Sequence, residues 1–281
     1  MTLSTIRNNP AKQKKVKTKK KKQKAIAATC AVAFWLLVWH VVSLCVGSEL
    51  VLVSPVKVVQ TLFTVIFDPD FLKTVWYSAA RILGGFFTAL TLGTVLGWVA
   101  SRFWVVETLL RPITAVIKAT PVASFIILVL LWFSGKNLSV IISMLMVFPV
   151  IYMNVLEGIR SADEKLLEMA QVFRLSVGKK LLYIYLPAVA PFFVSACSVS
   201  LGLCWKSGIA AEVIGTPDGS IGAVFYQAKI FLQTSELLAW TVVVVAVSVA
   251  FEKLFMLLLR LILKKAQNGG RVKWQACIIS S

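Results

Sequence analysis

Charged residues are scarce in this sequence. Asp, Glu, Lys and Arg together make up 15% of the 281 residues, whereas hydrophobic residues make up 58%. An average soluble domain carries about 25% charged residues and roughly 45–50% apolar ones, because its surface has to be covered with polar groups. The composition therefore excludes an ordinary soluble domain and indicates that much of the apolar surface faces lipid.

Residues used in metal, redox and hydrolytic chemistry are also few. The chain has one histidine, His40, and five cysteines with no CxxC pair among them, so neither a zinc site nor a redox motif is predicted. HExxH, GxSxG and paired carboxylates within an apolar stretch are missing, which argues against a membrane-embedded enzyme. A Walker A glycine loop is missing as well, so the chain does not bind ATP by that device. We expect no cofactor, no metal and no catalytic residue.

Acidic residues number 12 against 30 basic ones, and the basic residues are unevenly distributed. Ten of them lie within the first 24 residues, a block with too little apolar content to offset the entropy of ordering. We expect residues 1–24 to form a disordered cytoplasmic tail whose partners are anionic headgroups of the membrane lipid. A nucleic-acid partner is not predicted, because no aromatic residue is interleaved with the basic ones to stack on bases.

Six stretches are long and apolar enough to cross a bilayer, which takes about 20 residues per helix. They cover residues 25–47, 73–101, 112–134, 138–157, 187–211 and 236–262. No convincing signal-peptide cleavage site follows the first stretch, so we interpret it as an uncleaved helix. Between the first two stretches, Ser54 and Pro55 suit the cap and first turn of a short helix that extends to Phe67.

The sequence is thus divided into an all-α integral membrane domain, 25–262, with about six transmembrane helices, and a C-terminal cytoplasmic tail, 263–281. Loop charges set the expected orientation. With the N-terminus inside the cell, cytoplasmic segments hold 24 of the 30 basic residues, and the ratio is still 14 to 6 without the N-terminal tail. We therefore predict a multi-pass protein of the bacterial plasma or inner membrane with both termini in the cytoplasm.

The polar segment 158–185, between the fourth and fifth spans, is too long and too regularly patterned for a simple connector. Ser161 to Glu164 match a capping box, in which the serine caps a helix and the glutamate reaches back. Apolar residues then recur three to four positions apart, which predicts an amphipathic helix. These residues are Leu166, Met169 or Ala170, and Phe173. Ser176 is suited to cap a second short helix, and the two helices are expected to dock a cytoplasmic partner.

Within this segment the sequence resembles the EAA motif of ABC-importer permeases, which reads E-A-A-x3-G-x9-I-x-L-P. The match extends from Glu168 to Pro187 without a gap, with Met169 in place of the middle alanine and Arg174 in place of the glycine. Because the glycine supplies a tight turn in the family, Arg174 implies a turn that does not demand positive φ; if φ is positive, the strain is about 1 kcal/mol. The resemblance assigns the contact with an ATPase to Glu168, Met169, Ala170, Phe173, Arg174, Ile184, Leu186 and Pro187.

The resemblance covers roughly residues 50–260 and is closest to the nitrate/sulfonate/taurine branch of these permeases. Its further elements are Ser54-Pro55, Ser78-x-x-Arg81-x-x-x-Gly85-Phe86, Glu107-x-x-x-Arg111-Pro112, Thr120-Pro121, Leu131-Trp132-Phe133, Gly158-x-Arg160-Ser161, Trp205, Ala211-Glu212-x-x-Gly215 and Gly219-x-x-Gly222. It implies the fold of a type I ABC-importer permease with a cytoplasmic EAA coupling helix, and a transport subunit rather than an enzyme. The implied partners are two cytoplasmic ABC ATPase subunits, an extracellular or periplasmic substrate-binding protein and a second permease, expected here to be an identical copy.

Charges within the predicted spans suggest where a solute passes. Arg81, Lys206 and Glu212 lie in or at the edge of spans, where a central charge costs about 2.5–3.5 kcal/mol and needs a partner or water. In one interpretation Arg81 and Lys206 attract an anionic solute. In the other, which we favour, one of them pairs with Glu212 and holds helices together. With Trp205, these three residues are the pathway candidates.

The main alternative to an ATP-driven importer is a channel or secondary carrier that works without an ATPase. A secondary carrier is often built from inverted repeats, and no internal repeat is evident among the spans. A chain of intramembrane carboxylates for ion coupling is also missing. The patterned segment 158–185 therefore favours the importer, which is expected to carry a small solute that resembles nitrate, sulfonates or taurine.

Overall fold

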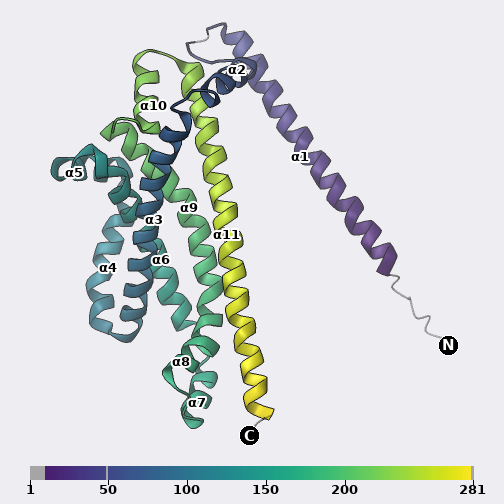
Figure 1. Ribbon diagram of the computed structural model, residues 1–281, viewed down its shortest axis with the longest axis vertical. Coiled ribbons are helices and arrows are strands. Elements are labelled where there is room, and N and C mark those ends of the chain that lie inside the picture. Colours follow the sequence, from purple (N-terminus) through teal and green to yellow (C-terminus); the bar gives the residue numbers. More distant parts are fainter. Residues whose placement is uncertain (1–9, 49, 280–281) are drawn as a thin grey trace.

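A computed structural model describes the backbone of residues 10–48 and 50–279 and the side chains of residues 26, 27, 29–48 and 50–265. Every regular element in this part of the chain is helical, as Figure 1 shows, which confirms the all-α prediction. The helices are α1 (Pro10–Val46), α2 (Pro55–Ile66), α3 (Phe71–Arg102), α4 (Trp104–Ala119), α5 (Val122–Trp132), α6 (Gly135–Arg160), α7 (Glu164–Val172), α8 (Val177–Lys180), α9 (Leu186–Gly215), α10 (Ile221–Ile230) and α11 (Thr234–Ile279). A π-helical turn, Leu181–Tyr185, joins α8 to α9.

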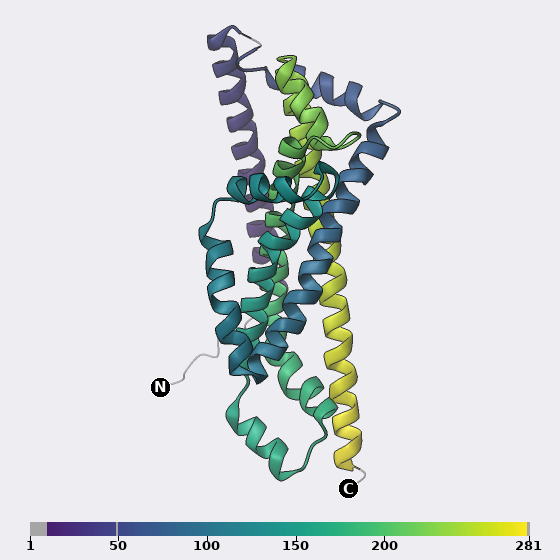
Figure 2. The same ribbon diagram turned by 90° about the vertical axis from the view of Figure 1, so that its left-hand side faces the viewer.

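Five helices of the described chain are long and apolar enough to cross a membrane, namely α1, α3, α6, the continuous α8–α9 segment and α11. Helices α4 and α5 are bent by 109° relative to each other, and together they are long and apolar enough for a sixth span if the bent pair is counted as one broken span. The apolar stretch predicted at 112–134 is thus divided between these two helices. Pro121 disfavours helical backbone at the preceding residue, and Thr120 is extended (φ −80°, ψ 133°) and ends α4. Helix α5 then lies across the direction of the other spans (Figure 2).

Helices α3, α6 and α9 form the centre of the bundle. Their buried side chains include Ile82, Phe86, Val147, Ile151 and Leu201. Small residues allow α3 and α6 to approach closely: a Cβ added at Gly93 would lie 3.0 Å from the Cβ of Ile151, and one added at Gly85 would overlap the carbonyl oxygen of Val140. Such close approach is typical of helices that pack within lipid.

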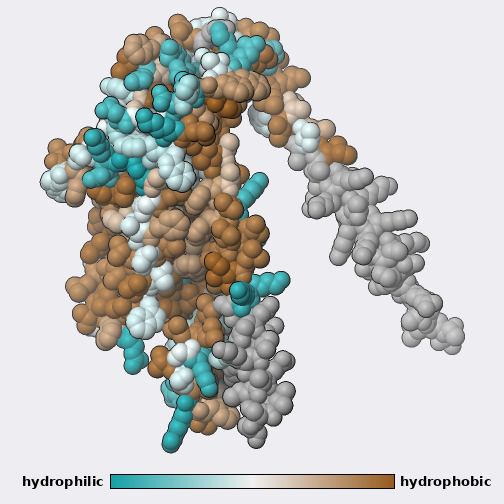
Figure 3. All heavy atoms as spheres, viewed as in Figure 1, coloured by the Kyte–Doolittle hydropathy of each residue, from teal (hydrophilic) through white to brown (hydrophobic). Residues whose placement is uncertain are grey.

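On the face shown in Figure 3, the bundle is apolar along its flank, and hydrophilic residues gather mainly at its two ends. One end carries α2 and α10, and the other carries α7 and α8 together with the C-terminal end of α11 (Figure 1). We refer to them as the α10 end and the α7 end. This distribution of hydropathy is what a protein needs when its middle faces hydrocarbon and its ends face water.

Helix α1 diverges from the bundle along most of its length (Figure 1), and only 6% of its apolar segment, Thr29–Val46, is buried. Its backbone is helical from Pro10 onward, so the helix extends into the basic segment that was expected to be disordered. Lysine has a high helix propensity, which accounts for this extension. Residues 1–9 lie outside the described part of the chain. At the other terminus, α11 likewise continues through the expected tail to Ile279.

Helix α2 confirms the short helix predicted between the first two spans. Ser54 is its N-cap, and the serine hydroxyl accepts a hydrogen bond from the backbone N–H of Lys57 at 3.4 Å. Pro55 occupies the first turn, where its missing N–H leaves no helical bond unmade. At the α10 end, α2 packs against α10 and α11 through Val65, Ile221 and Trp240.

Candidate functional site

The α7 loop, residues 158–185, projects from the α7 end of the bundle (Figures 1 and 2). Helix α7 is capped by Asp163, whose carboxylate accepts a hydrogen bond from the backbone N–H of Lys165 at 2.9 Å. The predicted capping box at Ser161 is therefore wrong. Helix α6 continues to Arg160, which leaves Ser161 in helical geometry instead of the extended geometry of an N-cap. The Ser161 hydroxyl donates to the carbonyl oxygen of Gly158.

Helix α7 ends in a left-handed turn at Arg174, where φ is +46°. The Arg174 N–H donates to the carbonyl of Gln171 at 3.0 Å, and the Leu175 N–H donates to the carbonyl of Ala170 at 2.9 Å. These are the two bonds of a Schellman C-cap, a motif that requires a left-handed residue at Arg174. The expectation that Arg174 avoids positive φ is therefore wrong, and the turn keeps the geometry that a glycine would favour.

The residues of the α7 loop face two ways. Ala170 and Ile184 are buried in a small apolar cluster with Ala162, so these two motif residues stabilise the loop itself. Glu168 is exposed, and so are several large apolar side chains around it. These are Leu166, Met169, Val172, Phe173 and Val177. Several exposed large apolar side chains on one short polar loop are typical of an interaction site.

The end of the motif joins the loop to the bundle. Leu186 and Pro187 form the first turn of α9, where the missing N–H of a proline is tolerated. The predicted second short helix exists as α8, which starts after Ser176, although the serine side chain makes no capping hydrogen bond. Through the π turn, α8 continues into α9, so the α7 loop leads directly into one of the three central helices.

An ion pair at the α7 end joins two of the segments that carry the family resemblance. The Arg160 guanidinium at the end of α6 contacts the Glu107 carboxylate in the first turn of α4. Each charge also lies at the helix end whose dipole favours it, acidic at an N-terminus and basic at a C-terminus. The pair ties the broken span to the helix that leads into the α7 loop.

A second polar cluster lies near the α10 end. The Ser78 hydroxyl of α3 donates to the fully buried Glu212 carboxylate of α9 at 2.6 Å, and it accepts from the Ile221 N–H of α10 at 2.9 Å. The Gly222 N–H donates to the same carboxylate at 3.4 Å. Because a Cβ at Gly222 would overlap the Cβ of Glu212, only glycine lets α10 come this close to α9. Three helices are held together by these contacts.

Arg81 does not form a salt bridge with Glu212 within the described chain. Its guanidinium donates to the Tyr77 hydroxyl at 2.8 Å and to the Ser139 hydroxyl at 3.4 Å. The Nη2 atom of Arg81 is buried and has no hydrogen-bond partner, and the same is true of Oε1 of Glu212. The favoured interpretation, a cation paired with Glu212, is therefore not what the geometry shows.

Lys206 lies on the exposed side of α9, whereas the neighbouring Trp205 is buried against the bundle. Lys206 forms no ion pair with any residue whose side chain is described. It therefore presents an exposed positive charge on a span whose one other charged residue, Glu212, is buried. Of the four pathway candidates, Lys206 is the one whose charge faces outward, while Glu212 and Trp205 face the interior.

Glu252, near the middle of α11, was not among the candidate residues. Its carboxylate accepts a hydrogen bond from the Ser198 hydroxyl of α9 at 3.0 Å. The only signal in the sequence is a single acidic residue inside the last predicted span, and its partner cannot be named without the packing of α9 on α11. No group of three or more His, Cys, Asp or Glu side chains that could hold a metal ion occurs among the described residues.

Comparison with known proteins decides the family. The family described as "Binding-protein-dependent transport system inner membrane component" matches residues 89–268. The chain belongs to this family. The matched region of this permease contains the α7 loop, the Glu107–Arg160 ion pair, Lys206 and Glu212, whereas Ser78 and Arg81 precede it.

Named permeases of three kinds resemble this one along most of its length. A putative aliphatic sulfonates transport permease of Bacillus subtilis is 29% identical over 82% of this chain and 83% of its own. A taurine transport system permease of Escherichia coli is 27% identical over 76% of this chain and 80% of its own. A nitrate import permease of a Synechocystis species is 25% identical over 72% and 76%, respectively. The resemblance to the nitrate/sulfonate/taurine branch is thereby confirmed.

Proposed function

We propose that this permease subunit docks a cytoplasmic ATPase through its α7 loop and conducts a small anionic solute that a binding protein delivers at the α10 end. The single observation that carries the proposal is the exposed apolar patch of the α7 loop, formed by Leu166, Met169, Val172, Phe173 and Val177 around Glu168. These side chains belong to the loop that projects from the α7 end of the bundle (Figure 1). A protein partner would bury them, and Glu168 would supply a charge at the rim of the contact.

Orientation follows from the charges. With the α7 end in the cytoplasm, the segments predicted from the sequence to be cytoplasmic, which were assigned 24 of the 30 basic residues, lie on the side that the positive-inside rule favours. Both termini then lie in the cytoplasm. A membrane-impermeant maleimide should leave Gly178→Cys in the α7 loop unlabelled in intact cells and should label Asp218→Cys at the α10 end, each in a chain whose native cysteines are replaced. Labelling of Gly178→Cys but not of Asp218→Cys would show that the orientation is the opposite of the one proposed.

Docking is tested with a pair of matched phenylalanines. Phe173 caps the C-terminus of α7 and is 69% exposed, and Phe231 caps the C-terminus of α10 at the other end and is 70% exposed. Replacing either with alanine removes the same apolar area from a similar local backbone. If Phe173 is part of the contact, Phe173→Ala should reduce co-purification of the ATPase subunit at least tenfold, which corresponds to about 1.4 kcal/mol.

Phe231→Ala should leave co-purification unchanged. Equal retention of the ATPase by both variants, at equal abundance of the permease, would contradict docking at the α7 loop. Glu168→Lys reverses a charge at the same surface and should weaken the complex more than Phe173→Ala does. Placing two like charges against each other costs more binding free energy than losing one contact. Solute uptake that continues without any ATPase subunit would favour the alternative, a channel or secondary carrier.

An anionic solute is supported by the exposed cation on α9 and by the names of the relatives. Aliphatic sulfonates, taurine and nitrate all carry an anionic group, and Lys206 offers an unpaired positive charge to such a group. In a dimer of two copies, the exposed face of α9 would line the pathway between them. Lys206→Met should therefore lower uptake of anionic solutes without lowering protein abundance.

Lys229→Met is the control for this change, since Lys229 is an exposed lysine of α10 at the same end of the bundle. Its loss should leave the solute preference unchanged. Uptake of taurine, an alkanesulfonate and nitrate by the two variants, measured side by side, separates a pathway charge from a general surface charge. Uptake by Lys206→Met equal to that of the unaltered chain for all three compounds would remove Lys206 from the pathway.

A further inference from the structure

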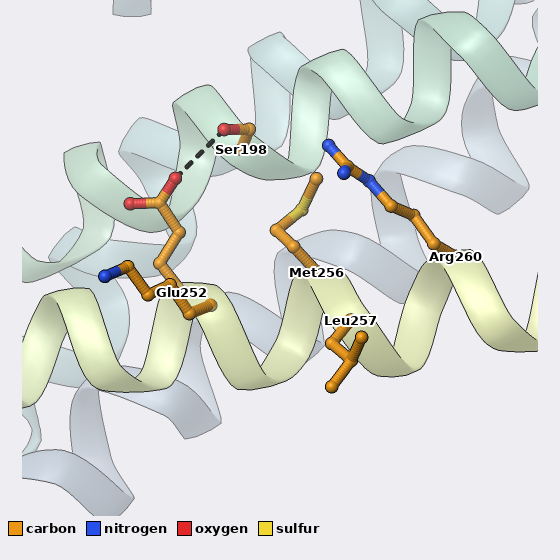
Figure 4. Close-up of a pocket in the computed structure, with 6 residues that line it drawn as sticks. Ser198, Glu252, Met256, Leu257 and Arg260 are labelled. Carbon is orange, nitrogen blue, oxygen red and sulfur yellow. Dashed lines mark hydrogen bonds between the residues drawn. The ribbon is translucent and has the colours of Figure 1, made fainter. Parts of the chain in front are cut away.

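A groove of about 320 Å3 opens between α9 and α11, on the half of the bundle toward the α7 end. It is lined by Ser198, Glu252, Lys253, Met256, Leu257 and Arg260. Figure 4 shows that Met256 and Arg260 extend from α11 toward α9, and that the Glu252 carboxylate is hydrogen-bonded to Ser198. The groove has no role in the function proposed above, and it combines an apolar wall with three ionisable groups.

The charges of the groove are not balanced. The Glu252 carboxylate is engaged by the Ser198 hydroxyl at 3.0 Å. Lys253 and Arg260 are exposed and form no ion pair within the part of the chain whose side chains are described. Two cations against one carboxylate leave a net charge of +1 on a surface that otherwise faces lipid. An ionisable group in such a position needs a partner, and none is found among the residues whose side chains the structure describes.

The depth of these residues in the membrane points to that partner. Glu236 opens α11 at the α10 end, and a hydrocarbon core of about 30 Å that begins after it would end some 20 residues later, near Met256. Arg260 then lies about 6 Å beyond that boundary, among the headgroups. Lys253 lies about 5 Å inside the boundary, and its long aliphatic stem can carry the ammonium toward the headgroups.

We propose that this groove binds the phosphate of an anionic phospholipid from the leaflet at the α7 end. Lys253 and Arg260 are two helical turns apart on α11 and reach the phosphate from either side, next to Met256 and Leu257, while the acyl chains extend from the phosphate along the groove toward the centre of the bilayer. The net charge selects the class of lipid. A headgroup of charge −1 neutralises the site, whereas a zwitterionic headgroup leaves one cation uncompensated in a low-dielectric region. Basic pockets between spans bind anionic headgroups in this way.

Glu252 sets the strength of this selection, because it cancels one of the two positive charges. Only the assignment of the leaflet to the cytoplasmic side depends on the proposed function, through the orientation of the α7 end. Lipid binding by the purified permease does not depend on an ATPase or on solute transport. Failure of one proposal is therefore distinguishable from failure of the other.

The test is native mass spectrometry of the full-length permease, purified in detergent and incubated with phosphatidylglycerol or phosphatidylethanolamine. The unaltered chain should retain phosphatidylglycerol in preference to phosphatidylethanolamine. Lys253→Gln with Arg260→Gln should lower phosphatidylglycerol retention roughly 10- to 30-fold, since each cation near a headgroup contributes about a factor of five. The control, Lys264→Gln with Lys265→Gln, removes the same charge from the same helix outside the groove and should change retention less than about twofold.

Glu252→Gln is a second, independent variant for the same measurement. It raises the net charge of the groove and should therefore increase the retention of phosphatidylglycerol. A purely structural role of Glu252 would not produce that increase. Inorganic phosphate at millimolar concentration should not displace the lipid, because a free ion lacks the acyl contacts along the groove. Equal retention of the two lipids, displacement by inorganic phosphate, or equal losses in the groove and control variants would each overturn the proposal. If the double variant does not fold, the direction of change in Glu252→Gln decides.

Discussion

Arg174 occupies a backbone position that suits glycine, so Arg174→Gly should stabilise the α7 loop. The left-handed region costs an L-residue about 1–2 kcal/mol, and Arg174 is held there at φ +46° by the two hydrogen bonds of the Schellman turn. Glycine removes this cost but adds about 0.4–1 kcal/mol of conformational entropy to the open loop. The net gain should be about 0.5–1 kcal/mol in the free energy of loop opening.

Hydrogen exchange measures this gain directly, because the Leu175 N–H donates to the Ala170 carbonyl at 2.9 Å across the turn. A stabilisation of 0.5–1 kcal/mol should slow exchange of that amide about two- to fivefold relative to the unaltered permease. Amides in the middle of α6 should be unaffected, since the α7 loop can open without the bundle.

Arg174→Ala is the matched control for the same measurement. Alanine loses the guanidinium but keeps the Cβ that causes the strain, so its exchange at Leu175 should stay within about twofold of the unaltered chain. Equal slowing by the alanine and glycine variants would show that the side chain, and not the backbone, is the source of strain. Faster exchange in Arg174→Gly would refute the strain argument altogether.

Two further predictions concern the polar cluster near the α10 end. Ser78→Ala leaves the buried Glu212 carboxylate without the hydroxyl that donates to it at 2.6 Å, and it should destabilise the purified permease by about 1–3 kcal/mol in thermal unfolding. The control is Ser248→Ala, which loses only a hydrogen bond within its own helix and should cost less than about 0.5 kcal/mol. Gly222→Ala forces a Cβ onto Glu212 and should lower the unfolding temperature, while Gly84→Ala, whose Cβ meets nothing within 4 Å, should leave it equal or higher. Equal effects within either pair would contradict the packing described.

The spans were predictable because each is a run of about 20 apolar residues, a pattern that depends on local composition alone. The break at Thr120 and Pro121 was not, although the proline was visible, because a proline in a span either kinks the helix or ends it, and tertiary packing decides between the two. Likewise, the position of the α7 cap depended on how far α6 extends. Because α6 continues to Arg160, Ser161 is the C-cap of α6 and not, as predicted, the N-cap of α7.

The sequence predicted which residues belong to the candidate site, but not which other residues they contact. The resemblance to the EAA motif located Glu168 and Ala170, yet the burial of Ala170 and the exposure of Met169 follow from how α7 turns back on Ile184. Pairs such as Ser78 with Glu212 join segments more than 130 residues apart, and no local pattern reports such contacts. Arg81 and Glu212 form no salt bridge because their charged groups are too far apart in the fold. The sequence shows that both residues are charged, but it does not give the distance between them.

The contacts at the two ends of α9 define what a docked ATPase could move. At the α7 end, α9 continues directly from the α7 loop, whose other end is the end of α6, and α6 is tied to α4 through Arg160 and Glu107. At the α10 end, Glu212 ties α9 to α3 and α10. Helix α9 has 30 residues and is therefore about 45 Å long. A displacement of the loop by a partner is thus expected to tilt α9 as a rigid element, because bending it would expose backbone hydrogen bonds to lipid. Lys206 lies between these two tied ends, so its position relative to a second copy would change without any rearrangement of its own surroundings.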